Sequence, residues 1–199
     1  MNPKIYVYKM VVDNGGAPCV WHGLLSLAIC KPMIRKSADE GDFIFGFGGR
    51  SRFPKEPLIY IAKVIAKPKV GDYYTLSKYK NRPDCIYHKV GDEARLKADA
   101  RFHNKSDERK KDVGLHFENA HVLLSNDFRY FGDEATADYK NQFPLIKDMV
   151  EKLRQGARVN HSPERYDELK ELMSQTWRNN SEKQIGKPTH LDRSLVCNK

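Results

Sequence analysis

The stretch FIFGFGGRSRFPKEPLIYIAKV, residues 43–64, contains the pattern that decides the fold. Its two ends, 43–47 and 58–64, are rich in aromatic and β-branched residues that pack well on a pleated surface, so we predict two strands. The connection over 48–57 contains paired glycines, prolines and arginines, a composition typical of a hairpin loop. The stretch therefore predicts two neighbouring strands joined by a long, basic loop.

Two more strands and a short helix are predicted before this hairpin. Residues 4–12 alternate aliphatic side chains with tyrosines and then reach the turn sequence DNGG, a pattern typical of a strand closed by a turn. Residues 24–30 are apolar and predict the second strand. Pro32 then stands in the first turn of a helix over 32–38, where proline is well tolerated.

One strand and two helices are predicted in the second half of the chain. Residues 115–124 have strand composition. The first helix carries apolar residues at helical spacing from Ile146 to Leu153 and reaches Gly156, which suits a left-handed C-cap. The second begins at Ser162, an N-cap residue followed by proline, and runs to Trp177.

Strands followed by helices predict an α+β fold, with a mostly antiparallel, barrel-like N-terminal sheet and two C-terminal helices. We predict a single domain over residues 1–177, interrupted at about 95–111 by a basic segment with little apolar periodicity. Such a segment is typical of a solvated insert. Residues 178–199 are polar and basic and predict a loosely packed tail.

The charge of the chain indicates the kind of partner. Lysine and arginine number 35 against 26 acidic residues in 199, a formal net charge of +9. Basic surfaces attract polyanions, so we predict a nucleotide or DNA as partner. No apolar run approaches the roughly 20 residues needed to cross a bilayer, so we predict no membrane contact. The first residues do not resemble an export signal.

The four cysteines lack CxxC spacing. This is typical of free thiols in a reducing compartment, so we expect a cytoplasmic protein. No metal site is predicted, because Cys19 and His22 supply half of one at most. His116 and His121 lie five residues apart on a predicted strand and so face opposite sides. The sequence does not identify a cofactor.

The segment GFGGRSR, residues 46–52, has two interpretations. Its backbone N–H groups could surround a phosphate, with Arg50 and Arg52 as further donors. Alternatively, the glycines serve the hairpin and the arginines are solvated at its tip. Both interpretations stay open, and Arg50 and Arg52 are candidate phosphate ligands.

Cys30 follows a predicted strand and precedes the short helix that carries Arg35. Neighbouring cations favour a thiolate, so Cys30 is a candidate nucleophile, and Lys31 and Arg35 are candidate phosphate ligands. Alternatively, Cys30 is a small apolar residue at a strand end. A nucleophile also needs a base, and the sequence does not choose among the candidates His22, His116, His121 and His161.

The segment SNDFRYFG, residues 125–132, concentrates polar and aromatic side chains after a predicted strand, where functional loops are common. Tyr130 could stack on a base while Arg129 holds a phosphate. Phe128 and Phe131 are better explained as core residues at a chain reversal.

Several short blocks of the sequence stand in an order and at spacings that match those of a known family. They are LAICKPMIRKSA (27–38), GDFIFG (41–46), LIY (58–60), DCIY (84–87), VLLS (122–125), YFG (130–132) and NH (160–161). Together they resemble the nucleotide modification associated domain 2 family of bacteria and phages, over most of the chain. The CKPMIR block is the most specific. The 95–111 segment and the residues after 177 have no counterpart that we recognise.

The resemblance implies association with systems that make or handle modified bases in DNA. By position it implies a functional set of polar residues, namely Cys30, Lys31, Arg35, Asp42, Ser125, Tyr130 and His161. Among these, Asp42 and Ser125 join the arginines as expected nucleotide contacts.

Two functions follow from these residues. The first is an enzyme acting on a nucleotide or a base in nucleic acid, with Cys30, Tyr130 and His161 in nucleophilic or proton-transfer roles. The alternative is a non-catalytic reader that stacks a modified or flipped base on Tyr130 or Trp21. A third class, a protein that binds an acidic protein partner, ranks below both.

Overall fold

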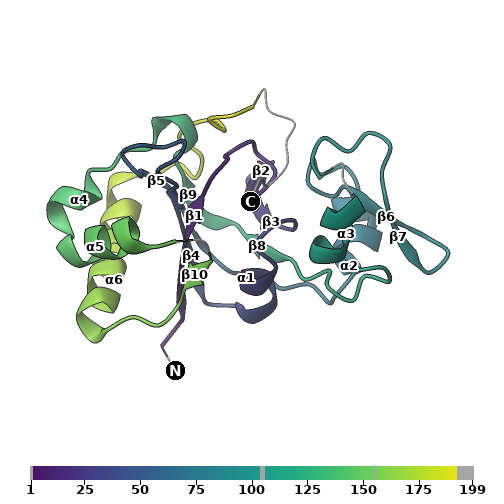
Figure 1. Cartoon of the computed structure of the whole chain (residues 1–199), viewed down its shortest axis with the longest axis horizontal. Helices are drawn as coiled ribbons and strands as arrows, with labels where there is room; N and C mark the ends of the chain where they lie inside the picture. The colour runs from purple at the N-terminus through teal and green to yellow at the C-terminus, as the bar shows by residue number, and fades with distance from the viewer. Residues whose placement is uncertain (1, 104–105, 155, 192–199) are drawn as a thin grey trace.

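The computed structural model describes residues 2–103, 106–154 and 156–191. Within these ranges, a mixed five-stranded sheet runs through the molecule in the order β10-β1-β4-β5-β9 (Figure 1). Its strands are β1 (Ile5–Met10), β4 (Phe43–Gly48), β5 (Leu58–Lys63), β9 (Asp127–Tyr130) and β10 (Ala157–Arg158). β1 and β4 are parallel, whereas the other neighbours are antiparallel. The sequence prediction of β1, β4 and β5 is confirmed.

Successive side chains of a strand point to opposite faces of its sheet, so the residues of β1 show what packs on each face. Ile5 and Val7 belong to the core under the C-terminal helices. Tyr6 and Tyr8 belong to a second core on the opposite face. The helices on the first face are α4 (Tyr139–Gln142), α5 (Pro144–Lys152) and α6 (Pro163–Asn179), on the left in Figure 1.

The two predicted C-terminal helices are confirmed. Ser162 caps α6 by accepting a hydrogen bond from the backbone N–H of Arg165. α5 ends earlier than predicted, because Leu153 already has an extended backbone (ψ 121°) and Gly156 lies beyond it.

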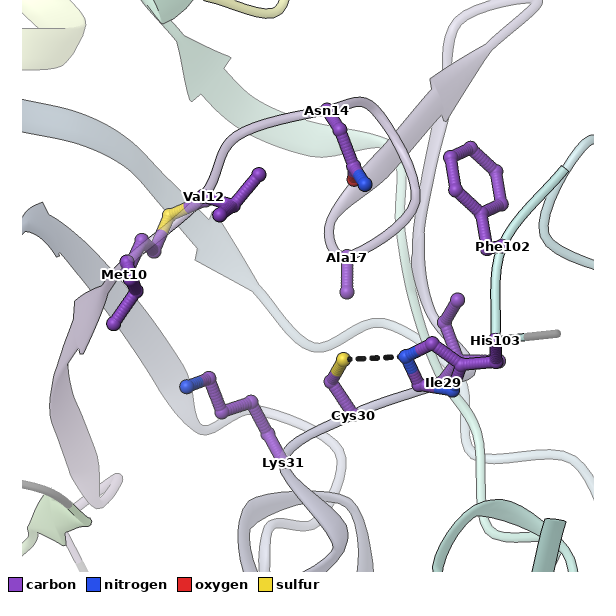
Figure 2. Close-up of a pocket in the computed structure, with 10 residues that line it drawn as sticks. Met10, Val12, Asn14, Ala17, Ile29, Cys30, Lys31, Phe102 and His103 are labelled. Carbon is purple, nitrogen blue, oxygen red and sulfur yellow. Dashed lines mark hydrogen bonds between the residues drawn. The ribbon is translucent and has the colours of Figure 1, made fainter. Parts of the chain in front are cut away.

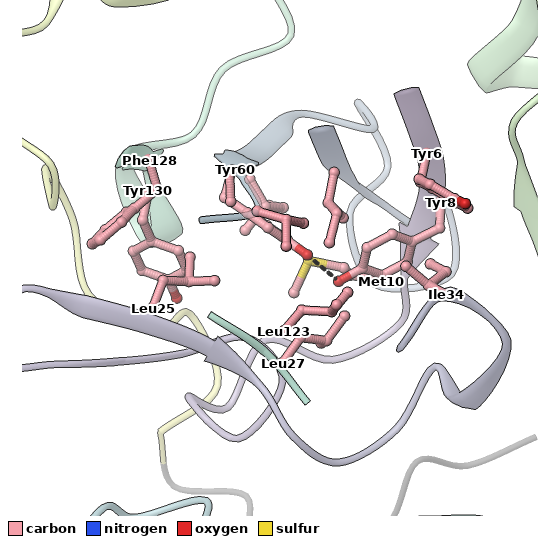
Figure 3. Close-up of a cluster of buried hydrophobic side chains, with 14 of the residues drawn as sticks. Tyr6, Tyr8, Met10, Leu25, Leu27, Ile34, Tyr60, Leu123, Phe128 and Tyr130 are labelled. Carbon is pink, nitrogen blue, oxygen red and sulfur yellow. Dashed lines mark hydrogen bonds between the residues drawn. The ribbon is translucent and has the colours of Figure 1, made fainter. Parts of the chain in front are cut away.

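A small sheet and a short helix cover the second face. The small sheet has the order β2-β3-β8, and the helix α1 carries the predicted proline in its first turn. The core between the two sheets is rich in tyrosine (Figure 3). These elements are β2 (Cys19–Trp21), β3 (Leu24–Leu27), β8 (Leu123–Ser125) and α1 (Pro32–Ser37).

A third group of elements packs beyond the small sheet, on the right in Figure 1. It has its own core, built around Tyr73, Tyr74 and Tyr87. Its elements are α2 (Asp72–Thr75), the 3-10 helix η1 (Ser77–Tyr79), β6 (Tyr87–Val90), β7 (Glu93–Leu96) and α3 (Ser106–Asp112). Another 3-10 turn, η2 (Gly132–Glu134), follows β9.

The expected barrel does not form: within the described residues, no sheet closes on itself. The strand predicted over 24–30 is limited to β3, Leu24–Leu27, which pairs with β2 and β8 and not with the large sheet. Helices cover the free face of the large sheet, so its apolar side chains are buried without closure. The strand predicted over 115–124 is also shorter, because β8 begins only at Leu123.

Two segments are more ordered than predicted. The described part of the 95–111 segment contains the end of β7, most of α3, and the buried residues Phe102 and His103, while most of its other described side chains stay at least partly exposed. The described part of the tail, residues 178–191, also packs on the large sheet, since Ile185 donates its N–H to the Tyr130 carbonyl and the Tyr130 N–H donates to the Lys183 carbonyl. In the described ranges, no helix combines the length and apolar character that crossing a bilayer requires.

Candidate thiol site between the two sheets

A small cavity of about 70 Å³ lies where three chain segments meet (Figure 2). The end of β1 and the turn after it form one wall, and Phe102 and His103 form the opposite wall. Cys30 and Lys31, which connect β3 to α1, form the floor. The cavity therefore contains the first two residues of the CKPMIR block.

Cys30 points toward His103 from this floor. The Cys30 Sγ lies 3.1 Å from His103 Nε2, although the two residues are 73 positions apart in the chain. Cys30 and His103 both have positive φ angles, 57° and 51°, and so does Lys31 at 44°. Such conformations cost about 1–3 kcal/mol each for residues with a side chain and tend to cluster at functional sites.

Asp112, at the end of α3, bonds to the ring nitrogen of His103 that does not face Cys30. Its Oδ2 forms a short hydrogen bond with His103 Nδ1, and its Oδ1 accepts the backbone N–H of Cys30 at 2.9 Å. Tyr87 donates its hydroxyl to Oδ2 at 3.0 Å. The carboxylate thus orients both the histidine and the backbone of the cysteine, as the third group of a catalytic triad does.

Arg35 is fully buried beneath this arrangement. Its Nε donates to the Cys30 carbonyl at 2.6 Å, and its Nη1 donates to the carbonyls of Asp112 and His121 at 3.0 and 2.6 Å. Its Nη2 lies 3.7 Å from Asp112 Oδ1. Because its donors are taken by the protein, the geometry gives Arg35 a positioning role and does not favour the predicted phosphate contact.

Lys31 contributes a cation at the edge of the cavity. Its ammonium lies 4.8 Å from the centre of the Tyr8 ring and 3.4 Å from the Lys9 carbonyl. Burial lowers the pKa of this ammonium. Of the predicted phosphate ligands, Lys31 is the one that lines the cavity.

The redox state of Cys30 differs from the expectation of free thiols. Cys30 is disulfide-bonded, whereas Cys19 and Cys85 are free and buried. Burial raises the pKa of both free thiols. Cys197 lies outside the described residues. Thiol chemistry at Cys30 therefore requires prior reduction of its disulfide.

Tyr130 lies in the tyrosine core and not in the cavity. It is 1% exposed, and its hydroxyl donates to both oxygens of Asp13 at 2.7 Å. The adjacent pair Tyr8 and Tyr60 shares a hydrogen bond of 2.9 Å, drawn in Figure 3. This burial does not favour the predicted roles of Tyr130 in proton transfer or base stacking.

Burial of Asp13 predicts a pH-dependent stability, since it raises the pKa of this carboxyl from 3.8 to about 6. A carboxyl with a raised pKa in the folded protein stabilises the fold as it gains its proton. We therefore expect the free energy of unfolding, measured in urea, to rise by up to about 3 kcal/mol relative to Asp13→Asn as the pH falls from 7.5 to 4.

The groups that face Asp13 are Tyr130, Tyr8, Tyr60, Asp133 and His190. Because wild type and Asp13→Asn share all of them, the difference between the two proteins isolates Asp13. A difference that stays constant across this pH range would contradict the prediction.

Four of the other predicted residues have structural partners in the fold. Asp42 accepts the backbone N–H groups of Lys4 and Asp39. Ser125 exchanges hydrogen bonds with the Asp127 backbone. Arg129 donates to the Asn180 and Phe128 carbonyls and stacks on Trp177. His161 Nε2 bonds to the Ile5 carbonyl at 2.8 Å. None of these four residues lines the cavity.

The glycine-rich loop also has internal partners. The N–H groups of Gly48 and Gly49 donate to the carbonyls of Pro57 and Met10, so these two donors face the protein. Arg50 lies 3.1 Å from the buried carboxylate of Glu56. The N–H of Arg52 closes a turn by donating to Gly49. The hairpin interpretation of the glycines is therefore the better supported one.

Sequence reasoning did not find His103 and Asp112. Both lie in or next to the basic segment that was expected to be solvated, and neither stands in an apolar periodic pattern. Their burial, 6% and 1% exposed, is set by contacts with Cys30 and Arg35 that are remote in sequence. Among the described residues, no group of three or more histidine, cysteine or acidic side chains has an arrangement that could hold a metal ion.

Comparison with known proteins identifies a family. A family model described as nucleotide modification associated domain 2 matches residues 2–194. The match covers nearly the whole chain, including both the Cys30 segment and the His103–Asp112 segment. No curated protein and no solved structure matches the chain.

Proposed function

The chain belongs to the nucleotide modification associated domain 2 family, and from that premise we propose that its reduced form is a thiol enzyme. The proposed reaction removes or transfers an acyl substituent on a nucleotide or on a base in nucleic acid. One observation carries the proposal: the Cys30 sulfur, the His103 ring and the Asp112 carboxylate follow one another within hydrogen-bonding reach. Nucleophile, base and orienting acid in this order are the requirements of covalent catalysis by a thiol.

The proposed chemistry uses only groups of the chain and water. His103 Nε2 accepts the Cys30 proton as the sulfur bonds to the carbonyl carbon of the substrate. When the carbon–nitrogen or carbon–oxygen bond breaks, His103 returns this proton to the leaving group. Water, or an acceptor amine, then attacks the thioester with His103 again as base, and the Cys30 thiol is restored.

Lys31 is the proposed electrostatic partner of this step. A cation at the edge of the cavity favours the negative charge that develops on the carbonyl oxygen, or a phosphate of the same substrate. Its partial burial strengthens such an interaction, because a low-dielectric environment screens charge poorly.

The size of the cavity favours a small acyl group over a whole nucleobase as its occupant. At about 70 Å³, it is roughly half the volume of the 150 Å³ cavity that holds benzene in an engineered protein core. It suits a small acyl group or the edge of a ring. The alternative function, a reader that stacks a flipped base on Tyr130, is less well supported because Tyr130 is buried.

Hydrolysis of acylated nucleosides by the reduced protein tests the proposal. We expect free acid, detected by mass spectrometry, from a panel of nucleosides and single-stranded oligonucleotides that carry an acylated exocyclic amine. Cys30→Ala should abolish release, and His103→Asn should slow it by about 100-fold or more, the usual contribution of a general base.

His116→Gln is the matched control, because His116 is exposed and bonds to the Asp92 carbonyl away from the cavity. It should hydrolyse the panel at the wild-type rate. Release that persists in Cys30→Ala, or no release from any member of the panel by the reduced wild type, would contradict the acyl-transfer step.

A further inference from the structure

A second and larger hollow, of about 790 Å³, lies outside the thiol site. One side is formed by the end of α2, by η1 and by the residues after it, and the other side by β6 and by the chain that leaves β7. We call it the lysine groove. Its volume is in the upper part of the roughly 300–1,000 Å³ range of ligand sites.

Cations dominate the groove. Among the described residues that line it are Lys80, Lys89 and Lys97, against one carboxylate, Asp99. Lys80 and Lys89 are exposed, and Lys97 is fixed by donating to the Lys80 carbonyl at 2.9 Å. Lys89 pairs with Asp92 at 3.2 Å, but such an exposed pair is weak and can exchange its partner for a phosphate.

The remaining lining side chains suit a nucleic-acid strand. Thr75, Ser77 and Asn81 add neutral hydrogen-bonding groups that can contact phosphate or sugar. Leu76 is 42% exposed in the same lining and offers an apolar surface for the face of a base.

One continuous segment connects the groove to the thiol site. Residues Lys97, Ala98 and Asp99 line the groove, and Phe102 and His103 line the cavity that contains Cys30. This link sets an upper limit on the distance between the groove and the cavity. The segment measures at most about 20 Å when extended, at roughly 3.4 Å per residue.

We propose that the lysine groove binds the phosphates of a single polynucleotide strand next to the nucleotide at the thiol site. This inference rests on the proposed function, and it names the substrate as a strand and not a free nucleotide. A free nucleotide has phosphates only beside its own base, whereas a strand also has phosphates on the flanking nucleotides. Cations outside the reactive cavity match the flanking phosphates.

Fluorescence anisotropy with a labelled single-stranded DNA of about 16 nucleotides, the upper end of common site sizes, tests the groove. We compare the reduced wild type with Lys80→Ala/Lys89→Ala over a series of NaCl concentrations. The double variant should bind about tenfold more weakly. The slope of log affinity against log salt should fall by about 1.4, because each single-strand phosphate contact contributes roughly 0.7.

Lys152→Ala/Lys170→Ala is the matched control, since it removes the same charge from exposed positions on α5 and α6. It should keep the wild-type slope and affinity to within about twofold. Equal losses in the two double variants would overturn the inference, because they would show an effect of net charge alone. Wild-type binding by the groove variant, or no binding by the wild type at low salt, would also overturn it.

The same proteins separate this inference from the proposed function. Cys30→Ala should bind the strand like the wild type, because it leaves the groove intact. If the groove variant loses DNA binding but the wild type releases no acid from any acylated nucleoside or oligonucleotide of the panel, the proposed function fails and the groove stands. If hydrolysis occurs and the groove variant binds DNA normally, the groove inference fails alone.

Discussion

Replacing Arg35 by methionine lowers the free energy of unfolding by about 3–5 kcal/mol, the usual cost of removing one partner of a buried ion pair. Arg35 is 0% exposed, and its loss removes the cation beside the Asp112 carboxylate and the donor to the carbonyls of Cys30 and His121. Since small domains are stable by roughly 5–15 kcal/mol, this loss is a large fraction of the total. Urea unfolding followed by circular dichroism measures it.

Lys36→Met is the control for this prediction, because Lys36 is the next residue of α1 and is exposed. It should change the stability by no more than about 0.5 kcal/mol. Arg35→Lys should recover little of the loss, since an ammonium cannot reproduce the fork of donors that reaches several carbonyls. Equal stability of Arg35→Met and Lys36→Met would contradict the positioning role of Arg35.

Replacing His103 by asparagine slows alkylation of the reduced Cys30 by about tenfold or more near neutral pH. The thiolate is the reactive form, and an ordinary cysteine is only a few per cent thiolate at pH 7, whereas a histidine partner raises that fraction. Asparagine suits the positive φ of position 103, so the variant keeps the backbone. Iodoacetamide labelling under reductant, followed peptide by peptide, gives the rate.

Cys19 and Cys85 are internal controls in the same experiment. Both are buried and burial raises their thiol pKa values, so they should react much more slowly than Cys30 in both proteins. An unchanged Cys30 rate in His103→Asn would show that the close contact between sulfur and ring does not activate the thiol.

The elements that the sequence predicted well are those with a local signature. β1 alternates tyrosine with aliphatic residues, β5 is a continuous apolar run, and α6 begins with a serine cap followed by proline. In each, the pattern of a few neighbouring residues matches the period of the element. These elements supply the central sheet and the helical layer.

The arrangement of the sheets could not be predicted from local patterns. The segment after Cys19 has ordinary strand composition, but whether it joins β1 or forms a separate sheet with β8 depends on partners about a hundred residues later. The barrel prediction was wrong for this reason. The order of the early strands around the glycine-rich hairpin suggested closure, whereas β1 lies parallel to β4 and the sheet stays open.

Two of the residues that line the cavity were candidates from the sequence alone. Cys30 and Lys31 were identified from their position at a strand end, and both line the cavity. His103 was not identified from the sequence, because the charged composition of the residues around it predicted solvent exposure. In the structure, Phe102 and His103 are buried. Cys30 and His103 are 73 positions apart in the chain, and no local sequence pattern indicates that two residues at such a distance are in contact.

The pH dependence of Cys30 alkylation in the reduced wild-type protein tests the central claim most directly. An ordinary thiol, with a pKa near 8.5, reacts roughly a hundredfold faster at pH 8 than at pH 6, in proportion to its thiolate fraction. If His103 and Asp112 activate Cys30, the rate should change by less than about tenfold over that range. A rise of about a hundredfold would show that Cys30 behaves as an isolated thiol, and it would contradict the proposed enzyme.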